Sequence, residues 1–250
     1  MEMASRTHAG LVRMRNEDAL EVDLNYGVAV LADGMGGLMA GREASRLVVQ
    51  EVLTQLRKGA GQQVDRANAG ELPRESKLSF EGFGEAIHAA HQQVLQASAA
   101  KEMKAQMGST VVIWGVSDGR WSAAHVGDSR LYRWHANALE QLSTDHSLAQ
   151  RMLDSGEVEP GVDVEAHYGH VLTQGLGLRQ PIEPGFHGGD IVGVGERFLL
   201  CSDGLSDMVS EENMSQALAL EDLEDAADQL LGFALDMGGK DNISLVLIEP

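Results

Sequence analysis

The stretch YGVAVLADGMGG, residues 26–37, carries the strongest structural signal in this sequence. The five consecutive apolar residues 28–32 are typical of a strand that is buried on both faces. Asp33 ends this apolar run, and three of the next four residues are glycine. An ionised carboxylate at the end of a buried strand is costly unless a positive group meets it. The sequence therefore predicts a cation or another positive partner near Asp33.

The composition narrows the class of protein. The chain has 250 residues, of which 43% are hydrophobic, and this suits a globular protein that we expect to form a single domain over 1–250. Its net charge of −19 argues against binding to nucleic acid or to an anionic membrane surface. The sequence has no apolar run long enough for a membrane helix, no signal-peptide core and a single cysteine, so a cytoplasmic protein without an internal disulfide is expected. We also expect a monomer.

Hydrophobic periodicity predicts an α+β fold with helices covering the faces of antiparallel sheets. Strand-like runs occur at 26–32, 110–116, 121–126, 130–134, 196–201 and 243–248, and helical patterns at 42–57, 83–98 and 222–237. The polar stretch 57–81 is expected to be an exposed insertion or loop. The Gly- and Pro-containing segment at about 143–190 is expected to form an irregular lobe attached to the core.

Carboxylates recur at the ends of the predicted strands. The set comprises Asp33 and Asp203, each followed by glycine, Asp128 in a tight turn, Asp241 before the last strand, and Glu17 and Asp18 before an early strand. A single Asp–Gly pair is most simply a turn. Several carboxylates at one sheet edge would repel one another and need a cation. Oxygen ligands without His or Cys favour Mg²⁺ or Mn²⁺ over zinc.

Two such ions about 4 Å apart are a common arrangement for attack on phosphate esters. Water between the ions becomes hydroxide and attacks phosphorus, so that no protein nucleophile is needed. The substrate phosphate would require a bidentate cation, for which Arg13 is the candidate, although Arg13 alone is more simply a solvated surface charge. The sequence contains neither a Gly-x-Ser-x-Gly motif nor a P-loop, which argues against a serine hydrolase and a P-loop nucleotide site.

Seven motifs resemble, in order, those of the metal-dependent Ser/Thr protein phosphatases of type 2C, and of their bacterial branch in particular. They are VRMRNED, LADGMGG, GSTVVI, VGDSRLY, LSTDHSL, LLCSDGLSD and DNISLVLI, and they run from Arg13 to Ile248. The resemblance implies an α/β/β/α sandwich of two antiparallel sheets with helices outside, and acidic residues gathered at one end. It also implies that the lobe at about 143–190 is the family's flap beside the active site.

The resemblance also assigns roles to residues. Asp33 would bridge two Mn²⁺ or Mg²⁺ ions, and the Gly34 carbonyl would bind one of them. Asp203 and Asp241 would hold the first ion, while Glu17 and Asp18 would act mostly through water. Asp128 would share a third, weaker metal with Asp203. Arg13 would hold the substrate phosphate, so that the catalytic set is Arg13, Asp33, Asp203 and Asp241.

Two departures from the family pattern stand out. Met35 occupies the position of a histidine that many eukaryotic members have as a proposed general acid. The proton donor is therefore open between a metal-bound water and another group, and His125 and His146 are candidates, although both are more simply core or turn residues. In the flap, HVLTQGLG at 170–177 replaces a more usual NVLTRALG, which changes the charge at Gln174 and the helix propensity at Gly175.

The leading hypothesis is a Mn²⁺- or Mg²⁺-dependent phosphatase that acts on phosphoserine and phosphothreonine in the substrates of a cognate Ser/Thr kinase. The main alternative is a non-catalytic phosphoprotein-binding module on the same fold. Such modules lose metal-binding aspartates, whereas Asp33, Asp203 and Asp241 are all present here. A third possibility is a phosphoesterase acting on small molecules or nucleic acid, and the strongly acidic chain disfavours nucleic acid.

Overall fold

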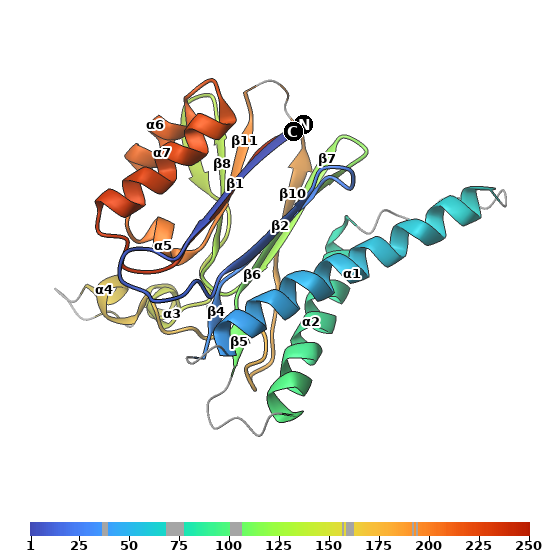
Figure 1. The fold of residues 1–250 in the computed structure, drawn as a ribbon, viewed down its shortest axis with the longest axis horizontal. Helices are drawn as coiled ribbons and strands as arrows, with labels where there is room; N and C mark the ends of the chain where they lie inside the picture. Colours follow the sequence, from blue (N-terminus) through green and yellow to red (C-terminus); the bar gives the residue numbers. More distant parts are fainter. Residues whose placement is uncertain are drawn as a thin grey trace.

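Two five-stranded antiparallel sheets lie face to face, and helices cover the outer face of each sheet (Figure 1). The computed structural model describes residues 1–36, 40–68, 78–100, 107–156, 158, 163–191, 193 and 195–250. The strand order is β1-β12-β11-β8-β9 in the first sheet and β10-β7-β6-β3-β2 in the second. This arrangement confirms the expected α/β/β/α sandwich.

The strands are mostly five to seven residues long. The first sheet contains β1 (Glu2–His8), β12 (Ile243–Glu249), β11 (Arg197–Cys201), β8 (Arg130–His135) and β9 (Ala138–Gln141). The second contains β10 (Gly185–Asp190), β7 (Arg120–Val126), β6 (Val111–Ser117), β3 (Val28–Ala32) and β2 (Ala19–Asp23). A separate two-stranded pair joins β4 (Gly34–Met35) to β5 (Gly108–Ser109).

The helices fall into three groups. The second sheet is covered by α1 (Ala40–Asn68) and α2 (Phe80–Ala100), and the first by α5 (Asp203–Ser206), α6 (Glu211–Leu218) and α7 (Leu223–Asp236). Two short helices, α3 (Leu148–Ser155) and α4 (Val164–Tyr168), lie in the expected flap. Within the described residues, no helix combines the length and the hydrophobicity needed to cross a bilayer.

The apolar run of β3 is explained by burial on both faces. Val28, Val30 and Ala32 belong to the core layer between the second sheet and its helices. Ala29 and Leu31 face the other way, into the layer between the two sheets. Because successive side chains of a strand alternate between faces, a strand in the middle of a four-layer sandwich has to be apolar at every position.

Two expectations about loops need correction. The end of the segment expected as an irregular lobe, Gly185–Asp190, is the edge strand β10, which pairs with β7. Its three glycines conceal a strand, since a Cβ at Gly185 would lie 2.3 Å from the His125 ring and one at Gly188 2.9 Å from the Phe80 ring. In the expected insertion, residues 57–68 continue α1 and Phe80 and Glu81 begin α2, whereas residues 69–77 lie outside the described residues.

Candidate metal centre

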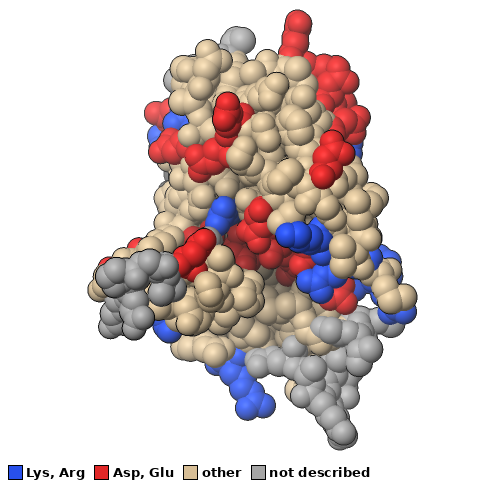
Figure 2. Space-filling view, turned by 90° about the vertical axis from the view of Figure 1, so that its left-hand side faces the viewer, with Lys and Arg blue, Asp and Glu red and all other residues tan. Residues whose placement is uncertain are grey.

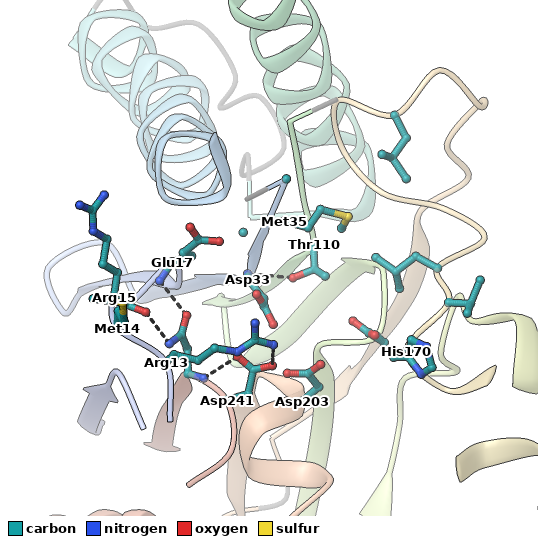
Figure 3. A pocket seen from close by; sticks show the side chains of 17 residues that line it. Arg13, Met14, Arg15, Glu17, Asp33, Met35, Thr110, His170, Asp203 and Asp241 are labelled. Carbon is teal, nitrogen blue, oxygen red and sulfur yellow. Dashed lines mark hydrogen bonds and ion pairs between the residues drawn. The ribbon is translucent and has the colours of Figure 1, made fainter. Parts of the chain in front are cut away.

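Acidic residues from both sheets meet in a cleft of about 1180 Å³ at one end of the sandwich. Asp33 directly follows β3 of the second sheet, whereas Asp203 begins α5 immediately after β11 and Asp241 lies just before β12 of the first sheet. Figure 3 shows these three carboxylates facing one another. Figure 2 shows a hollow with acidic side chains on its floor and basic side chains near its rim.

The structure therefore brings together most of the predicted ligand residues. Glu17, Asp33, Gly34, Asp128, Asp203 and Asp241 all line the cleft. Asp18 does not line it and is only 7% exposed, because it lies beneath the floor, where its Oδ2 accepts a hydrogen bond from the Ser202 hydroxyl at 3.0 Å. The water-mediated role expected for Asp18 stays a prediction.

The carboxylates strongly perturb one another. Burial, together with the charges of Asp18, Asp203 and Asp128, raises the pKa of Asp33 well above its usual value. Burial and neighbouring carboxylates raise the pKa of Asp203 to about 7, and burial is the main cause of the Asp18 pKa of about 6. The buried Oδ1 atoms of Asp18 and Asp203 have no hydrogen-bond partner among the described residues. Repelling carboxylates with unpaired oxygens are the environment that a divalent cation would stabilise.

Side chains alone do not complete a metal site here. In the part of the chain that the structure describes, no three His, Cys, Asp or Glu side chains are arranged to enclose an ion by themselves. A cation would therefore need backbone oxygen and water, which is the coordination that Mg²⁺ and Mn²⁺ favour. The Gly34 backbone is close-packed at this point, since a Cβ there would lie 2.1 Å from the Gly41 carbonyl oxygen. A Cβ at Gly41 would in turn lie 2.6 Å from Glu17 Oε2, so that glycine is needed at both positions for the two backbone segments to lie this close together.

Hydroxyl groups next to β3 fix the backbone of Asp33. The Asp33 N–H donates to Thr110 Oγ1 at 2.9 Å, and the Asp33 carbonyl accepts from the Ser109 hydroxyl at 2.8 Å and from the Thr110 N–H at 2.8 Å. These residues belong to the quoted motif GSTVVI, but the sequence alone gave them no role. Their hydrogen bonds orient Asp33 before any ligand is bound.

Asn242 ties the N-terminal loop to the start of β12. Its Oδ1 accepts from the Glu17 N–H at 2.8 Å, and its Nδ2 donates to the Ala9 carbonyl at 3.0 Å and the Arg15 carbonyl at 2.8 Å. Asn242 thereby places Glu17 beside Asp241. The sequence analysis missed this residue, although it stands directly after Asp241 in DNISLVLI.

Arg13 reaches the acidic cluster from the same loop. Its Nη2 lies 2.5 Å from Asp241 Oδ2, and this contact raises the pKa of the guanidinium further. The side chain is nevertheless 58% exposed at the mouth of the cleft. Arg13 is therefore both oriented by a candidate metal ligand and accessible to an anion.

A second, smaller cavity adjoins the cleft and is lined by Asp128, Asp203 and Asp207, together with His170. Burial, Asp203 and Asp145 raise the pKa of Asp128 well above its usual range. Sequence reasoning missed Asp207, whose signal was the second aspartate of LLCSDGLSD, one helical turn after Asp203. Arg130 and Asp145 also line this cavity and pair with each other, and the carboxylates of Asp128, Asp203 and Asp207 suit the weaker third ion expected at Asp128.

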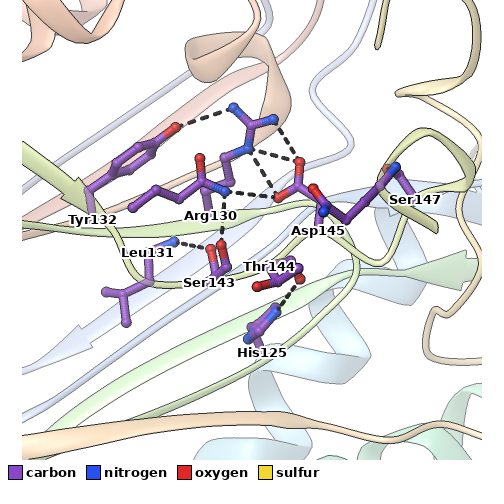
Figure 4. Close-up of polar contacts among 10 residues, drawn as sticks. His125, Arg130, Leu131, Tyr132, Ser143, Thr144, Asp145 and Ser147 are labelled. Carbon is purple, nitrogen blue, oxygen red and sulfur yellow. Dashed lines mark hydrogen bonds and ion pairs between the residues drawn. The ribbon is translucent and has the colours of Figure 1, made fainter. Parts of the chain in front are cut away.

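A buried ion pair supports this smaller cavity (Figure 4). The Arg130 Nε and Nη2 atoms donate to the Asp145 carboxylate at 2.7 to 3.1 Å, and its Nη1 donates to the Tyr132 hydroxyl at 3.3 Å. Asp145 is thereby neutralised by a bidentate partner. It differs in this respect from Asp203, whose Oδ1 is unpaired.

The two histidines considered as proton donors do not line the cleft. His125 is 2% exposed, and its Nε2 lies 2.9 Å from the Thr144 carbonyl oxygen (Figure 4). Its ring stacks on His146 at a centroid distance of 4.9 Å and on His187 at 5.4 Å. His146 Nδ1 accepts from the Gly127 N–H at 3.2 Å, which fixes it as a neutral acceptor. The cleft instead contains His170, an exposed flap residue that sequence reasoning did not single out.

The histidine stack predicts a loss of stability in mild acid. Burial lowers the pKa of His125 from 6.5 to about 4, so that between these values the unfolded chain binds the extra proton. The contribution of neutral His125 to the free energy of unfolding is therefore complete above the unfolded pKa and is lost as the pH falls. The free energy of unfolding should drop by about 2 kcal/mol between pH 7.5 and pH 5. Urea unfolding of the parent protein and of His125→Gln at both pH values measures this loss of stability. The difference between the two proteins should shrink at pH 5, and a constant difference would contradict the prediction.

Comparison with known proteins finds relatives that cover this whole chain. The family model described as protein phosphatase 2C matches residues 6–231. Protein phosphatase PhpP of Streptococcus pneumoniae is 30% identical over 254 residues, which cover all of this chain and 97% of that protein. Serine/threonine phosphatase stp of Listeria monocytogenes is 31% identical over 258 residues, covering all of this chain and 96% of that protein.

Solved structures agree with these sequence matches. The serine/threonine phosphatase PstP of Mycobacterium tuberculosis is 31% identical to this chain, with a TM-score of 0.81 over 98% of this chain and 97% of that structure. The catalytic domain of PstP in complex with two manganese ions gives a TM-score of 0.80 at 31% identity, over 98% of this chain and 96% of that structure. From its motifs, its fold and these relatives, this chain belongs to the protein phosphatase 2C family.

Proposed function

We propose that this chain is a Mn²⁺- or Mg²⁺-dependent phosphatase that hydrolyses phosphoserine and phosphothreonine in proteins, with residues 1–250 acting as one catalytic domain in the cytoplasm. The observation that carries the proposal is the set of recessed, partly unpaired carboxylates contributed by both sheets, with an arginine at their edge. The two manganese ions bound by the PstP relative support the choice of metal.

The residues divide into metal-holding and substrate-holding groups. Two ions would be held by Asp33, Asp203, Asp241 and the Gly34 carbonyl. Glu17 and Asp18 would act through water. A third ion would be held by Asp128 with Asp203 and Asp207. Bound divalent ions would supply an activated water and neutralise phosphoryl charge. The Arg13 fork, oriented by Asp241, would bind the phosphoryl oxygens and bring phosphorus over the acidic floor.

We propose that His170 protonates the leaving alcohol. In Figure 3 it lies across Asp203 and Asp241 from Arg13, where the seryl or threonyl oxygen would depart. Replacing His170 by Asn should lower kcat on a phosphothreonine peptide about a hundredfold, because an alkoxide is a poor leaving group without an acid. Hydrolysis of p-nitrophenyl phosphate should change far less, since nitrophenolate leaves unaided. Equal losses on both substrates would exclude His170 as the proton donor.

The proposed activity is tested by phosphate release from a phosphothreonine peptide. Release should require added Mn²⁺ and disappear when a chelator removes it. Folded protein that binds Mn²⁺ without releasing phosphate would favour the binding-module alternative. Faster release from nucleotides than from phosphopeptides would favour a small-molecule phosphoesterase. A phosphoprotein substrate also implies a partner Ser/Thr kinase, and size-exclusion chromatography would test whether the enzyme is a monomer.

A further inference from the structure

The two walls of the cleft differ in chemistry. The loop that precedes β2 contributes Arg13 and Arg15 to one side. The opposite side is mainly apolar and consists of Met35 with the flap residues Val171, Leu172 and Leu178, next to His170. Figure 3 shows Arg15 at one edge of the cleft, with its guanidinium directed away from the acids, while Met35 lies beyond Asp33 on the other side. A peptide lying across the floor would therefore meet a cation on one flank and hydrocarbon on the other.

Arg15 differs from Arg13 in its ion pairing. Arg13 is paired with Asp241, whereas Arg15 is exposed and makes no ion pair within the described residues. Its backbone is nevertheless fixed, because Asn242 donates to its carbonyl oxygen at 2.8 Å. The guanidinium thus extends from an anchored position at the rim of a site whose floor is strongly acidic.

Apart from His170, the described flap residues that line the cleft are apolar. Met35 and Leu178 pack together over Gly175, where a Cβ would lie 3.1 Å from Leu178 Cδ1 and 3.4 Å from Met35 Cε. The polar group of Gln174 is turned to the chain itself, since its Oε1 accepts from the Glu183 N–H at 2.6 Å. Among the described residues, no Lys or Arg side chain lines this wall. An acidic substrate side chain here would face the acidic floor without compensation.

We infer that the cleft selects phosphopeptides with an acidic residue on the Arg15 side of the phosphorylated residue and an apolar residue on the flap side. The inference rests on the proposed phosphatase function and adds the class of substrate sequence. Arg15 would pair with the acidic side chain in partly exposed surroundings. The flap wall would cover part of the apolar side chain.

A matched set of phosphothreonine peptides tests this inference. The peptides differ only in Glu or Gln on one flank and Leu or Ser on the other, and both orientations are made. In one orientation, Glu should raise kcat/KM over Gln by about three- to fivefold, as an exposed ion pair allows, and added salt should reduce this ratio. Partial burial of Leu should give a ratio over Ser of about fivefold that salt does not reduce.

Variants of Arg15 identify the residue responsible. Arg15→Ala should bring the Glu/Gln ratio to about one, and Arg15→Glu should reverse the preference in favour of a Lys peptide. Arg46→Ala, which removes an exposed arginine of α1 outside the cleft, should keep the ratio of the parent protein. Equal rates on the whole set of peptides, or an unchanged Glu/Gln ratio in Arg15→Ala, would overturn this inference and leave the proposed phosphatase function standing. Absence of Mn²⁺-dependent hydrolysis of every peptide would overturn the proposed function, and the inference with it.

Discussion

Replacing Asp203 by Asn is expected to lower kcat/KM by at least about a thousandfold, or about 4 kcal/mol, while making the metal-free protein more stable. Both effects have one cause. Asp203 is recessed beside Asp207, Asp241 and Asp18, and burial and these charges raise its pKa to about 7. Above that pH the carboxylate is ionised at a cost that only a cation offsets. The neutral amide removes the cost and the metal affinity together.

Thermal unfolding with chelator and with Mn²⁺ separates these effects. In chelator, Asp203→Asn should be stabilised by about 2 kcal/mol, which raises Tm by roughly 5 °C for a chain of this size. Mn²⁺ should raise the Tm of the parent protein, because the ion binds only the folded state, and should raise that of the variant far less. Asp118→Asn, at an exposed turn, is the matched control and should change neither value. An inactive variant that is also less stable in chelator would point to misfolding instead of metal loss.

The sequence was most informative where burial constrained every residue. The strands β3, β6, β7, β8, β11 and β12 lie within two residues of their predicted bounds. In β3, β6, β11 and β12 the reason is a continuous apolar run, which is typical of the central strands of a sandwich. The edge strands β1, β9 and β10 were missed, and β1 and β10 show the opposite reason. EMASRTH has only two apolar residues, which are adjacent, and GFHGGD is rich in glycine, so that each depends on pairing with a neighbour for its conformation.

In the candidate site, too, some residues could be predicted from the sequence and others could not. Strand-end aspartates followed by glycine stand out in a sequence, and the structure brings Asp33, Asp203 and Asp241 into one cleft. Asn242, Arg15 and His170 could not be found this way, because their importance depends on what lies opposite them in space. Asn242 joins segments 225 residues apart, and no local pattern encodes such a contact.

Gly204→Ala is expected to disrupt the site through the backbone, although it removes no functional group. A Cβ at residue 204 would lie 1.9 Å from the carbonyl oxygen of Asn242 and 2.8 Å from its carbon. Neither atom is on a flexible side chain, so either α5 or the start of β12 has to move. These two segments carry Asp203 and Asp241. We expect a loss of about 3 kcal/mol of stability from overpacking and about a hundredfold loss of kcat/KM from misplaced ligands.

Gly232→Ala provides the contrast that makes this prediction specific. Gly232 lies inside α7, and a Cβ there would meet nothing within 4 Å. The substitution should stabilise the protein by about 0.5 to 1 kcal/mol through helix propensity, with activity unchanged. Urea unfolding should therefore show lower stability for Gly204→Ala and higher stability for Gly232→Ala. Mn²⁺-dependent phosphate release should fall for Gly204→Ala only. If Gly204→Ala kept full stability and activity, the close approach of α5 to β12 would not be what holds Asp203 and Asp241 in position.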